Sequence, residues 1–105
     1  MYPALTALAE PNRLQIVELL RDGPRSVGEI VKQLQLSQPQ ISRHLRILHE
    51  AGLVEVQPQA QQRIYRLHGR AFKDLDEWIS TFRVVWEERL DGFENYMKTI
   101  QAEDR

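Results

Sequence analysis

The segment from Ser37 to Leu48 constrains the fold of this 105-residue chain most, because it predicts one helix with two chemically different sides. Ile41, Leu45 and Leu48 recur at spacings of four and three, which places them in one apolar stripe. The side chains that fall off this stripe are polar or basic, and they are Gln38, Gln40, Ser42, Arg43 and Arg46. Amide, hydroxyl and guanidinium groups can bond to base edges and phosphates. The segment therefore predicts a helix that packs on a core with one side and contacts DNA with the other.

A more apolar helix precedes this segment. It begins at Pro11 and ends at the Asp-Gly-Pro sequence of residues 22–24, which is a strong stop signal. The residues that we expect it to bury are Leu14, Ile16, Val17, Leu19 and Leu20.

Two capping boxes mark the starts of the next two helices. Ser26 is followed three residues later by Glu29, and Ser37 is followed three residues later by Gln40. The second of these helices, with Ser37 as its N-cap, is the polar-faced one, and Gly52 is a suitable residue to end it. A helix, a tight turn and a capped, polar-faced helix together predict a helix-turn-helix.

The apolar period changes from helical to alternating after Gly52. Residues 54–56 alternate, and residues 63–67 alternate again after a polar stretch at 58–62. Two short alternating runs around a polar turn predict a β-hairpin. A hairpin after a helix-turn-helix is the wing of a winged helix, and Arg63 and Arg66 are its candidate phosphate contacts.

The last third of the chain predicts one long helix over residues 71–100, about 45 Å long at ~1.5 Å per residue. A domain of this size has a radius of gyration of only about 13 Å, so the helix should extend past its core. An identical helix from a second copy is the simplest cover for its apolar stripe, although a purely intramolecular core helix is the alternative. The residues predicted to form the dimer interface are Leu75, Trp78, Ile79, Phe82, Trp86, Leu90, Phe93 and Met97.

Composition limits the class of protein. A chain of this length predicts one domain over residues 1–105, and it contains neither a membrane-spanning run nor a signal peptide, so we expect a cytoplasmic protein. It has no cysteine, which excludes thiolate chemistry. The net charge of −1 is uneven: residues 1–70 hold nine Lys or Arg and six Asp or Glu, whereas residues 71–105 hold five and nine. A basic front and an acidic tail agree with a polarised DNA-binding protein.

The chain resembles the ArsR/SmtB family of bacterial winged-helix repressors over about residues 4–70. The stretches that carry the resemblance are Ala9-Glu10-Pro11-Asn12-Arg13-Leu14, Ser26-Val27-Gly28-Glu29-Ile30, Leu36 to Leu45 and Ala51-Gly52-Leu53-Val54. The tail, with Trp78 and Trp86, resembles the metal-independent branch that dimerises through long terminal helices. The resemblance implies a homodimer that represses transcription by binding an inverted repeat near a promoter. It implies base recognition by Gln38, Gln40, Ser42 and Arg43, of which Arg43 could pair with guanine and a glutamine with adenine. The eight predicted DNA-binding residues are Ser37, Gln38, Gln40, Ser42, Arg43, Arg46, Arg63 and Arg66.

Several positions depart from the family pattern. Ser26 and Gly28 stand where metal-sensing members carry a Cys-x-Cys pair, and no histidine lies in the terminal helix, so we predict no metal site and no cofactor. The wing tip lacks glycine and clustered arginine, so we expect the wing to contribute little beyond Arg63 and Arg66. Gln35 stands where relatives often place a turn glycine, which would cost about 1 kcal/mol if the position needs a positive φ.

Two alternatives to a simple repressor stay open. One is a repressor gated by an apolar effector, bound between terminal helices at Trp78, Phe82, Trp86 and Phe93. The other is a protein-interaction module that has lost DNA binding, which the neutral wing would suit. No catalytic dyad, glycine-rich phosphate loop or metal cluster is visible, so we predict no catalytic residue and no enzymatic activity.

Overall fold

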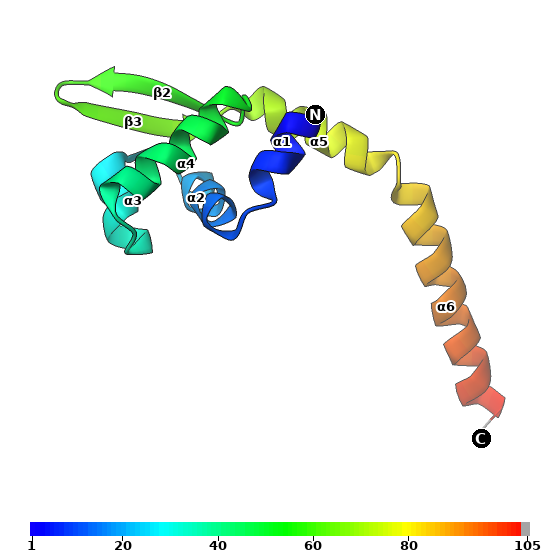
Figure 1. The fold of residues 1–105 in the computed structure, drawn as a ribbon. Helices are drawn as coiled ribbons and strands as arrows, with labels where there is room; N and C mark the ends of the chain where they lie inside the picture. The colour runs from blue at the N-terminus through cyan, green and yellow to red at the C-terminus, as the bar shows by residue number, and fades with distance from the viewer. Residues whose placement is uncertain (104–105) are drawn as a thin grey trace. The chain divides into compact units, whose positions relative to one another are not determined.

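A computed structural model describes residues 1–103 of the chain. Backbone contacts divide it into two compact units, Met1–Asp74 and Leu75–Arg105, which are described separately. No helix in the described part is long and apolar enough to cross a membrane. The elements in chain order are α1 (Tyr2–Leu8), α2 (Pro11–Arg21), β1 (Arg25–Ser26), α3 (Val27–Leu34), α4 (Gln38–Glu50), β2 (Val54–Gln59), β3 (Gln62–Leu67), α5 (Gly69–Ser80) and α6 (Arg83–Glu103) (Figure 1).

Both predicted capping boxes are present. In α3 the Ser26 side chain accepts from the Glu29 N–H at 3.2 Å, and the Glu29 carboxylate accepts from the Ser26 N–H at 3.1 Å. In α4 the same reciprocal pair joins Ser37 and Gln40. Gly52, at φ 80°, follows the last turn of α4, where the Leu53 N–H donates to the Leu48 carbonyl at 3.0 Å. The helix-turn-helix prediction is confirmed, and its boundaries come from local hydrogen bonds.

The core of the first unit lies between α2, α3, α4 and the hairpin (Figure 1). Its fully buried side chains are Ile16, Ile30, Ile41, Leu45, Leu48 and Leu53. The stripe of Ile41, Leu45 and Leu48 is therefore buried as predicted, and Leu14 was wrongly placed in the core, since it is 42 % exposed. The apolar residues of α2 lie on more than one face of the helix and form no single stripe, so their spacing could not separate buried positions from exposed ones.

The wing is an antiparallel hairpin in a three-stranded sheet of order β1-β3-β2. The short strand β1, which the sequence pattern did not reveal, pairs Ser26 with Ile64 and so ties the start of α3 to the wing. The hairpin closes at the pair Gln59 and Gln62. Ala60 begins the turn at φ 56°, a conformation that glycine or asparagine usually supplies.

The predicted continuous helix over residues 71–100 is wrong, because it is interrupted between α5 and α6. The Thr81 and Phe82 N–H groups bond to carbonyls three residues back, at Trp78 and Ile79, instead of four. The Thr81 hydroxyl also donates to the Trp78 carbonyl at 2.7 Å. Threonine side chains compete with helical backbone bonds in this way, which a search for apolar periodicity does not detect.

Candidate nucleic-acid interface

The exposed face of α4 and the wing enclose an open groove that also includes the start of α3. Its lining residues are Ser26, Val27, Gly28, Gln38, Pro39, Ser42, Arg43, Arg46, His49, Val56, Gln61, Gln62, Arg63 and Tyr65. Five of the eight predicted DNA-binding residues are in this set: Gln38, Ser42, Arg43, Arg46 and Arg63. The groove therefore brings together two segments that are far apart in the sequence.

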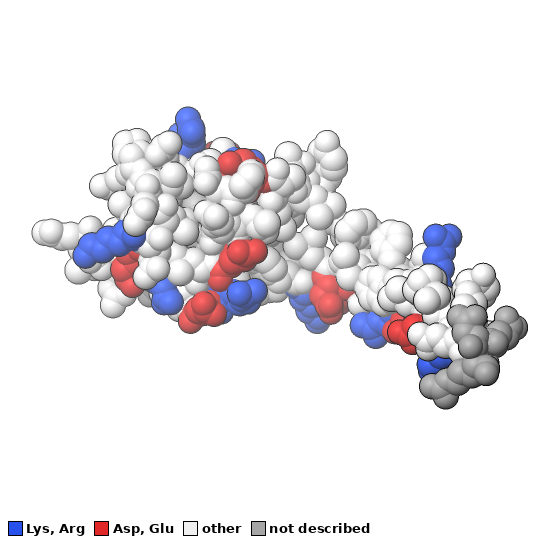
Figure 2. Space-filling view, turned by 90° about the horizontal axis from the view of Figure 1, so that it is seen from below, with Lys and Arg blue, Asp and Glu red and all other residues white. Residues whose placement is uncertain are grey.

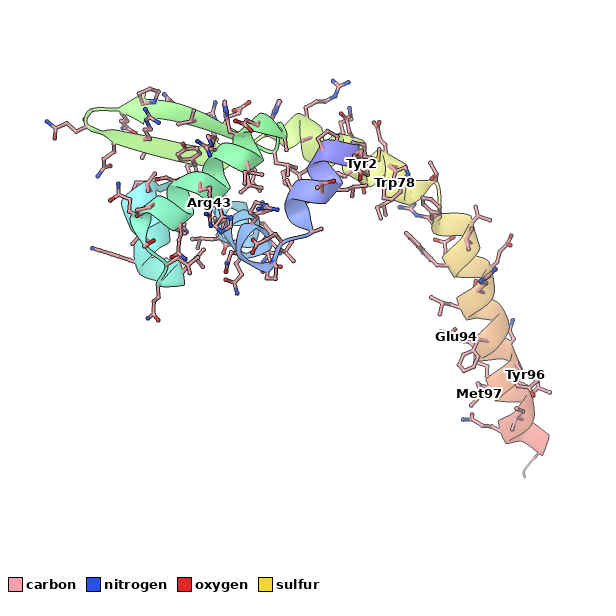
Figure 3. The ribbon with its side chains drawn as sticks, viewed as in Figure 1. Tyr2, Arg43, Trp78, Glu94, Tyr96 and Met97 are labelled. Carbon is pink, nitrogen blue, oxygen red and sulfur yellow. The ribbon has the colours of Figure 1, made fainter. Side chains whose placement is uncertain are left out.

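The charge of the groove is of one sign. Arg43, Arg46 and Arg63 line it, no Asp or Glu does, and none of the three forms an ion pair within residues 1–103. Acidic and basic side chains are interspersed on the face shown in Figure 2, in keeping with the net charge of −1. The excess of positive charge is thus concentrated in the groove and not spread over the surface. It lies next to the polar face of α4, which carries Arg43 (Figure 3).

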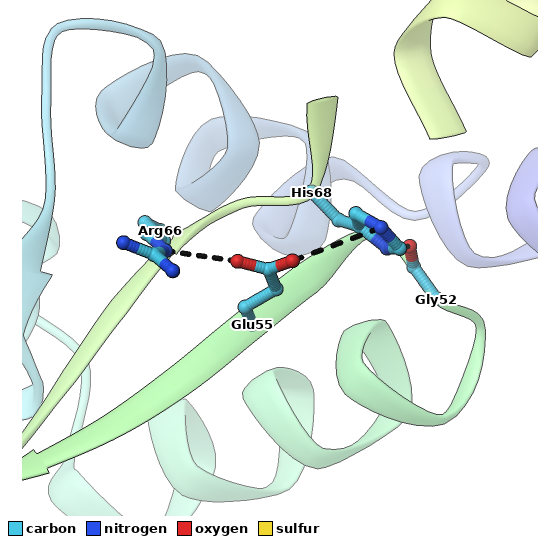
Figure 4. Close-up of polar contacts among 4 residues, drawn as sticks. All are labelled: Gly52, Glu55, Arg66 and His68. Atoms are coloured by element: carbon cyan, nitrogen blue, oxygen red, sulfur yellow. Dashed lines mark hydrogen bonds and ion pairs between the residues drawn. The ribbon is translucent and has the colours of Figure 1, made fainter. Parts of the chain in front are cut away.

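Arg66 is not among the groove residues. Its Nε donates to Oε2 of Glu55 at 2.9 Å, directly across the hairpin (Figure 4). The other Glu55 oxygen lies 3.7 Å from Nε2 of His68, whose Nδ1 is 3.1 Å from the Gly52 carbonyl. The structure therefore places Arg66 in a polar cluster at the base of the wing.

Ser37 and Gln40 also lie outside the groove lining, although both are exposed. They bond to each other across the first turn of α4, which makes them the cap of this helix. His44, on the opposite side of α4, is 7 % exposed, and its Nδ1 lies 3.8 Å from a Glu10 oxygen without a hydrogen bond. His44 is therefore a buried packing residue beside the apolar stripe.

Sequence reasoning missed several residues of the groove. His49 could have been found, because it lies three residues after Arg46 on the same face of α4. The glutamines Gln61 and Gln62 belong to the wing tip, which was expected to contribute little, yet they line the groove. The start of α3 enters it through the pairing of β1 with β3, for which the sequence carries no recognisable signal.

The start of α3 also holds the titratable side chain Glu29. The Ser26 backbone N–H, followed by its hydroxyl, holds the pKa of Glu29 below its usual value of 4.5. The carboxylate is ionised at neutral pH and stays with the cap instead of the groove.

The predicted dimer residues are largely exposed on α5 and α6. Leu75 is half-buried, and the exposed fractions of the others are 36 % for Trp78, 45 % for Ile79, 45 % for Phe82, 39 % for Trp86, 58 % for Leu90, 61 % for Phe93 and 39 % for Met97. Trp78 and Phe82 stack edge to face with centroids 5.3 Å apart. Figure 3 shows Met97 and Tyr96 on α6. Helix α6 therefore exposes large apolar side chains, among them Trp86, Leu90 and Phe93.

The remaining predicted sites have different outcomes. Within residues 1–103, no group of three or more His, Asp or Glu side chains could hold a metal ion. A second, apolar hollow is lined by residues of α1, α2 and the end of α4, and not by the aromatic residues expected for an effector pocket. Its lining residues are Tyr2, Pro3, Thr6, Ala7, Arg13, Ile47, Glu50 and Ala51.

Comparison with known proteins gives consistent matches. Residues 10–56 match the family described as bacterial regulatory protein, arsR family. The chain is 37 % identical to the transcriptional regulator Rv2034 of Mycobacterium tuberculosis, covering 86 % of this chain and 81 % of that protein. It is 32 % identical to the transcriptional repressor SdpR of Bacillus subtilis, covering 78 % and 91 %. A homodimeric winged helix-turn-helix DNA-binding domain, Mb0332 from Mycobacterium bovis, superposes with a TM-score of 0.64 at 31 % identity, covering 83 % of this chain and 78 % of that one.

Proposed function

Because the chain belongs to the arsR family of bacterial regulatory proteins, we propose that it is a transcriptional repressor that binds an inverted-repeat operator as a homodimer. The observation that carries this proposal is the groove between α4 and the wing, which three arginines and no acidic side chain line. The matched proteins are regulators and not enzymes, and one is a repressor by name. Its place of action would be the cytoplasm, where bacterial DNA lies.

Helix α4 supplies the base-reading surface in this proposal. In a helix-turn-helix, the second helix enters the major groove, and its N-terminal residues contact base edges. Gln38, Ser42 and Arg43 occupy the first two turns of α4 and line the groove. Arg43 can bond bidentately to guanine, and Ser42 can donate or accept.

Arg46 and Arg63 are suited to phosphate contacts. Arg46 lies one turn further along α4 from Arg43, and Arg63 stands on the wing opposite. Such contacts hold the protein on the duplex without reading its sequence. Arg66 is paired with Glu55. Contact of Arg66, Ser37 and Gln40 with DNA stays a prediction.

The dimer follows from the exposed apolar residues of α5 and α6. An uncovered stripe that includes Trp86, Leu90 and Phe93 is unfavourable in water, and a two-fold partner would cover it with the same surface. Two recognition helices would then stand about one DNA turn apart, ~34 Å, and read the two halves of an inverted repeat.

The test is a fluorescence-anisotropy titration with labelled DNA from upstream of the gene for this chain and from a randomised selection. Arg43→Ala should weaken binding to the selected site by ~1–3 kcal/mol, about 5- to 150-fold, and relax its specificity. Arg21→Ala, which removes an exposed arginine outside the groove, is the matched control and should change binding by less than twofold. A wild-type protein that selects no sequence would overturn the proposal, and an equal loss on all sequences would make Arg43 a phosphate contact.

A further inference from the structure

The two glutamines at the start of α4 differ in which of their amide atoms are free. Oε1 of Gln40 accepts from the Ser37 N–H at 3.0 Å and from the Ser37 hydroxyl at 3.0 Å. An amide oxygen has two lone pairs, and both are therefore in use. The Gln40 amide nitrogen has no partner among the hydrogen bonds of residues 1–103.

The orientation of the Gln40 amide is determined by its partner. A backbone N–H can only donate, so the atom 3.0 Å from the Ser37 nitrogen must be the oxygen. The Ser37 hydroxyl accepts from the Gln40 N–H at 3.3 Å, which leaves its own proton for the same oxygen. Rotating the Gln40 amide by half a turn would place its NH2 group against the Ser37 N–H. Two donors would then face each other, and the capping box would be lost.

Gln38 has no such restriction. It is exposed at the first position of α4, lines the groove, and makes no side-chain hydrogen bond within the described residues. Its oxygen and its nitrogen are both available to a ligand.

Adenine recognition in the major groove needs both amide atoms. The glutamine nitrogen donates to N7, and the glutamine oxygen accepts from the N6 amino group. Guanine also presents N7 but carries an acceptor, O6, in place of the amino group, so the accepting oxygen is what separates adenine from guanine. A glutamine that can only donate cannot make this distinction.

We propose that Gln38 is the adenine-reading glutamine of this protein, and that Gln40 faces DNA as a donor only, contacting a phosphate or a base acceptor. This assignment rests on the proposed function, because it presumes that α4 enters the major groove. Gln38 would then supply sequence specificity, and Gln40 would position the helix through its capping box.

The experiment compares Gln38→Ala with Gln40→Ala on the site that the wild-type protein selects from randomised duplexes. For every adenine in that site, the ratio of Kd values for the guanine-substituted and original duplexes is measured. Because the ratio compares two duplexes with one protein sample, a loss of folded protein by Gln40→Ala cancels. Gln40→Glu is the second variant: its carboxylate preserves the acceptor of the capping box, removes both donors, and should melt no lower than wild type.

With Gln38→Ala, the ratio at one adenine per half-site should fall by about 5- to 150-fold, which is ~1–3 kcal/mol, to near 1. With Gln40→Ala, Kd should rise similarly on both duplexes, and every ratio should stay within about twofold of wild type. The assignment is overturned if Gln40→Ala is the variant that loses the ratio, or if Gln38→Ala changes none. Failure of the wild type to select any duplex would instead overturn the proposed function.

Discussion

Arg43 and Arg66 carry the same charge and were both expected to contact DNA, but their neighbours separate them. Arg43 lines the groove with no acidic partner among the described residues, whereas Arg66 donates to Glu55 across the hairpin. Both members of that pair are about half exposed, and such pairs contribute only ~0–1 kcal/mol to stability. The pair matters because it directs the Arg66 guanidinium toward Glu55.

Gln35 has the positive φ for which the sequence analysis expected a local conformational cost. It ends α3 in the left-handed region, at φ 56° and ψ 35°, where a side chain crowds its own backbone. We therefore expect Gln35→Gly to raise the free energy of unfolding by about 1 kcal/mol, as measured by urea denaturation.

The matched control is Gln33→Gly, an exposed position inside α3, where glycine should lower the free energy of unfolding by ~0.5–1 kcal/mol. Equal effects of the two substitutions would show that the conformation of Gln35 carries no strain.

At the scale of elements, α3 and α4 begin with the same capping box but with different third residues. Glu29 can be titrated, and Gln40 cannot. The Ser26 N–H lowers the pKa of Glu29 in the folded state, so its contribution to stability is present above about pH 4.5 and is lost as pH falls through the lowered pKa. We expect the stability of the wild type to fall in this window partly through α3.

Glu29→Gln is the test, because the amide still accepts from Ser26 but does not titrate. Chemical denaturation between pH 3 and pH 7 should show wild type above the variant at neutral pH, with the gap closing toward pH 3. A gap that stays constant across this range would contradict the role given to the carboxylate. Gln40→Glu should introduce a new pH dependence of the same sign at α4.

The break between α5 and α6 is also a property of elements. Apolar positions recur at helical spacing straight through residues 80–83, so periodicity alone favoured one helix. The Thr81 hydroxyl and the three-residue hydrogen bonds end α5 there instead. The spacing of apolar residues indicates which face of a helix is apolar. It does not indicate whether the backbone hydrogen bonds of the helix continue without a break.

At the scale of the whole molecule, we propose that the exposed apolar stripe of α6 forms the dimer interface. Phe93 is 61 % exposed near the middle of this helix. Phe93→Glu would place a charge on each side of a two-fold interface, so we expect a dimer at micromolar concentration to become a monomer in sedimentation velocity. Operator affinity should fall at least tenfold, because the two half-sites would bind separately.

Glu94→Gln, one residue away on α6, is the matched control and should remain dimeric with unchanged operator affinity. If Phe93→Glu also sedimented as a dimer, the interface would have to lie elsewhere on the chain.

The sequence by itself determined the helix-turn-helix, the wing and the two faces of α4. Caps, turn residues and apolar periods act within a few residues, so they can be read without knowing the fold. It also predicted that the arginines of α4 and Arg63 contact DNA, from their residue types; the structure places them in one groove, and the DNA contacts stay a prediction. It missed strand β1 and the end of α5, and its one continuous terminal helix was wrong.

Only the tertiary structure decided which polar side chains share one surface. The pairing of β1 with β3 brings the start of α3 into the groove with Gln61, more than thirty residues away in the sequence. The hairpin register sets Glu55 against Arg66 and removes that arginine from the groove. The physical reason is the same in both cases. A donor or acceptor group can make only a few hydrogen bonds, and the fold decides which groups lie within bonding distance of it.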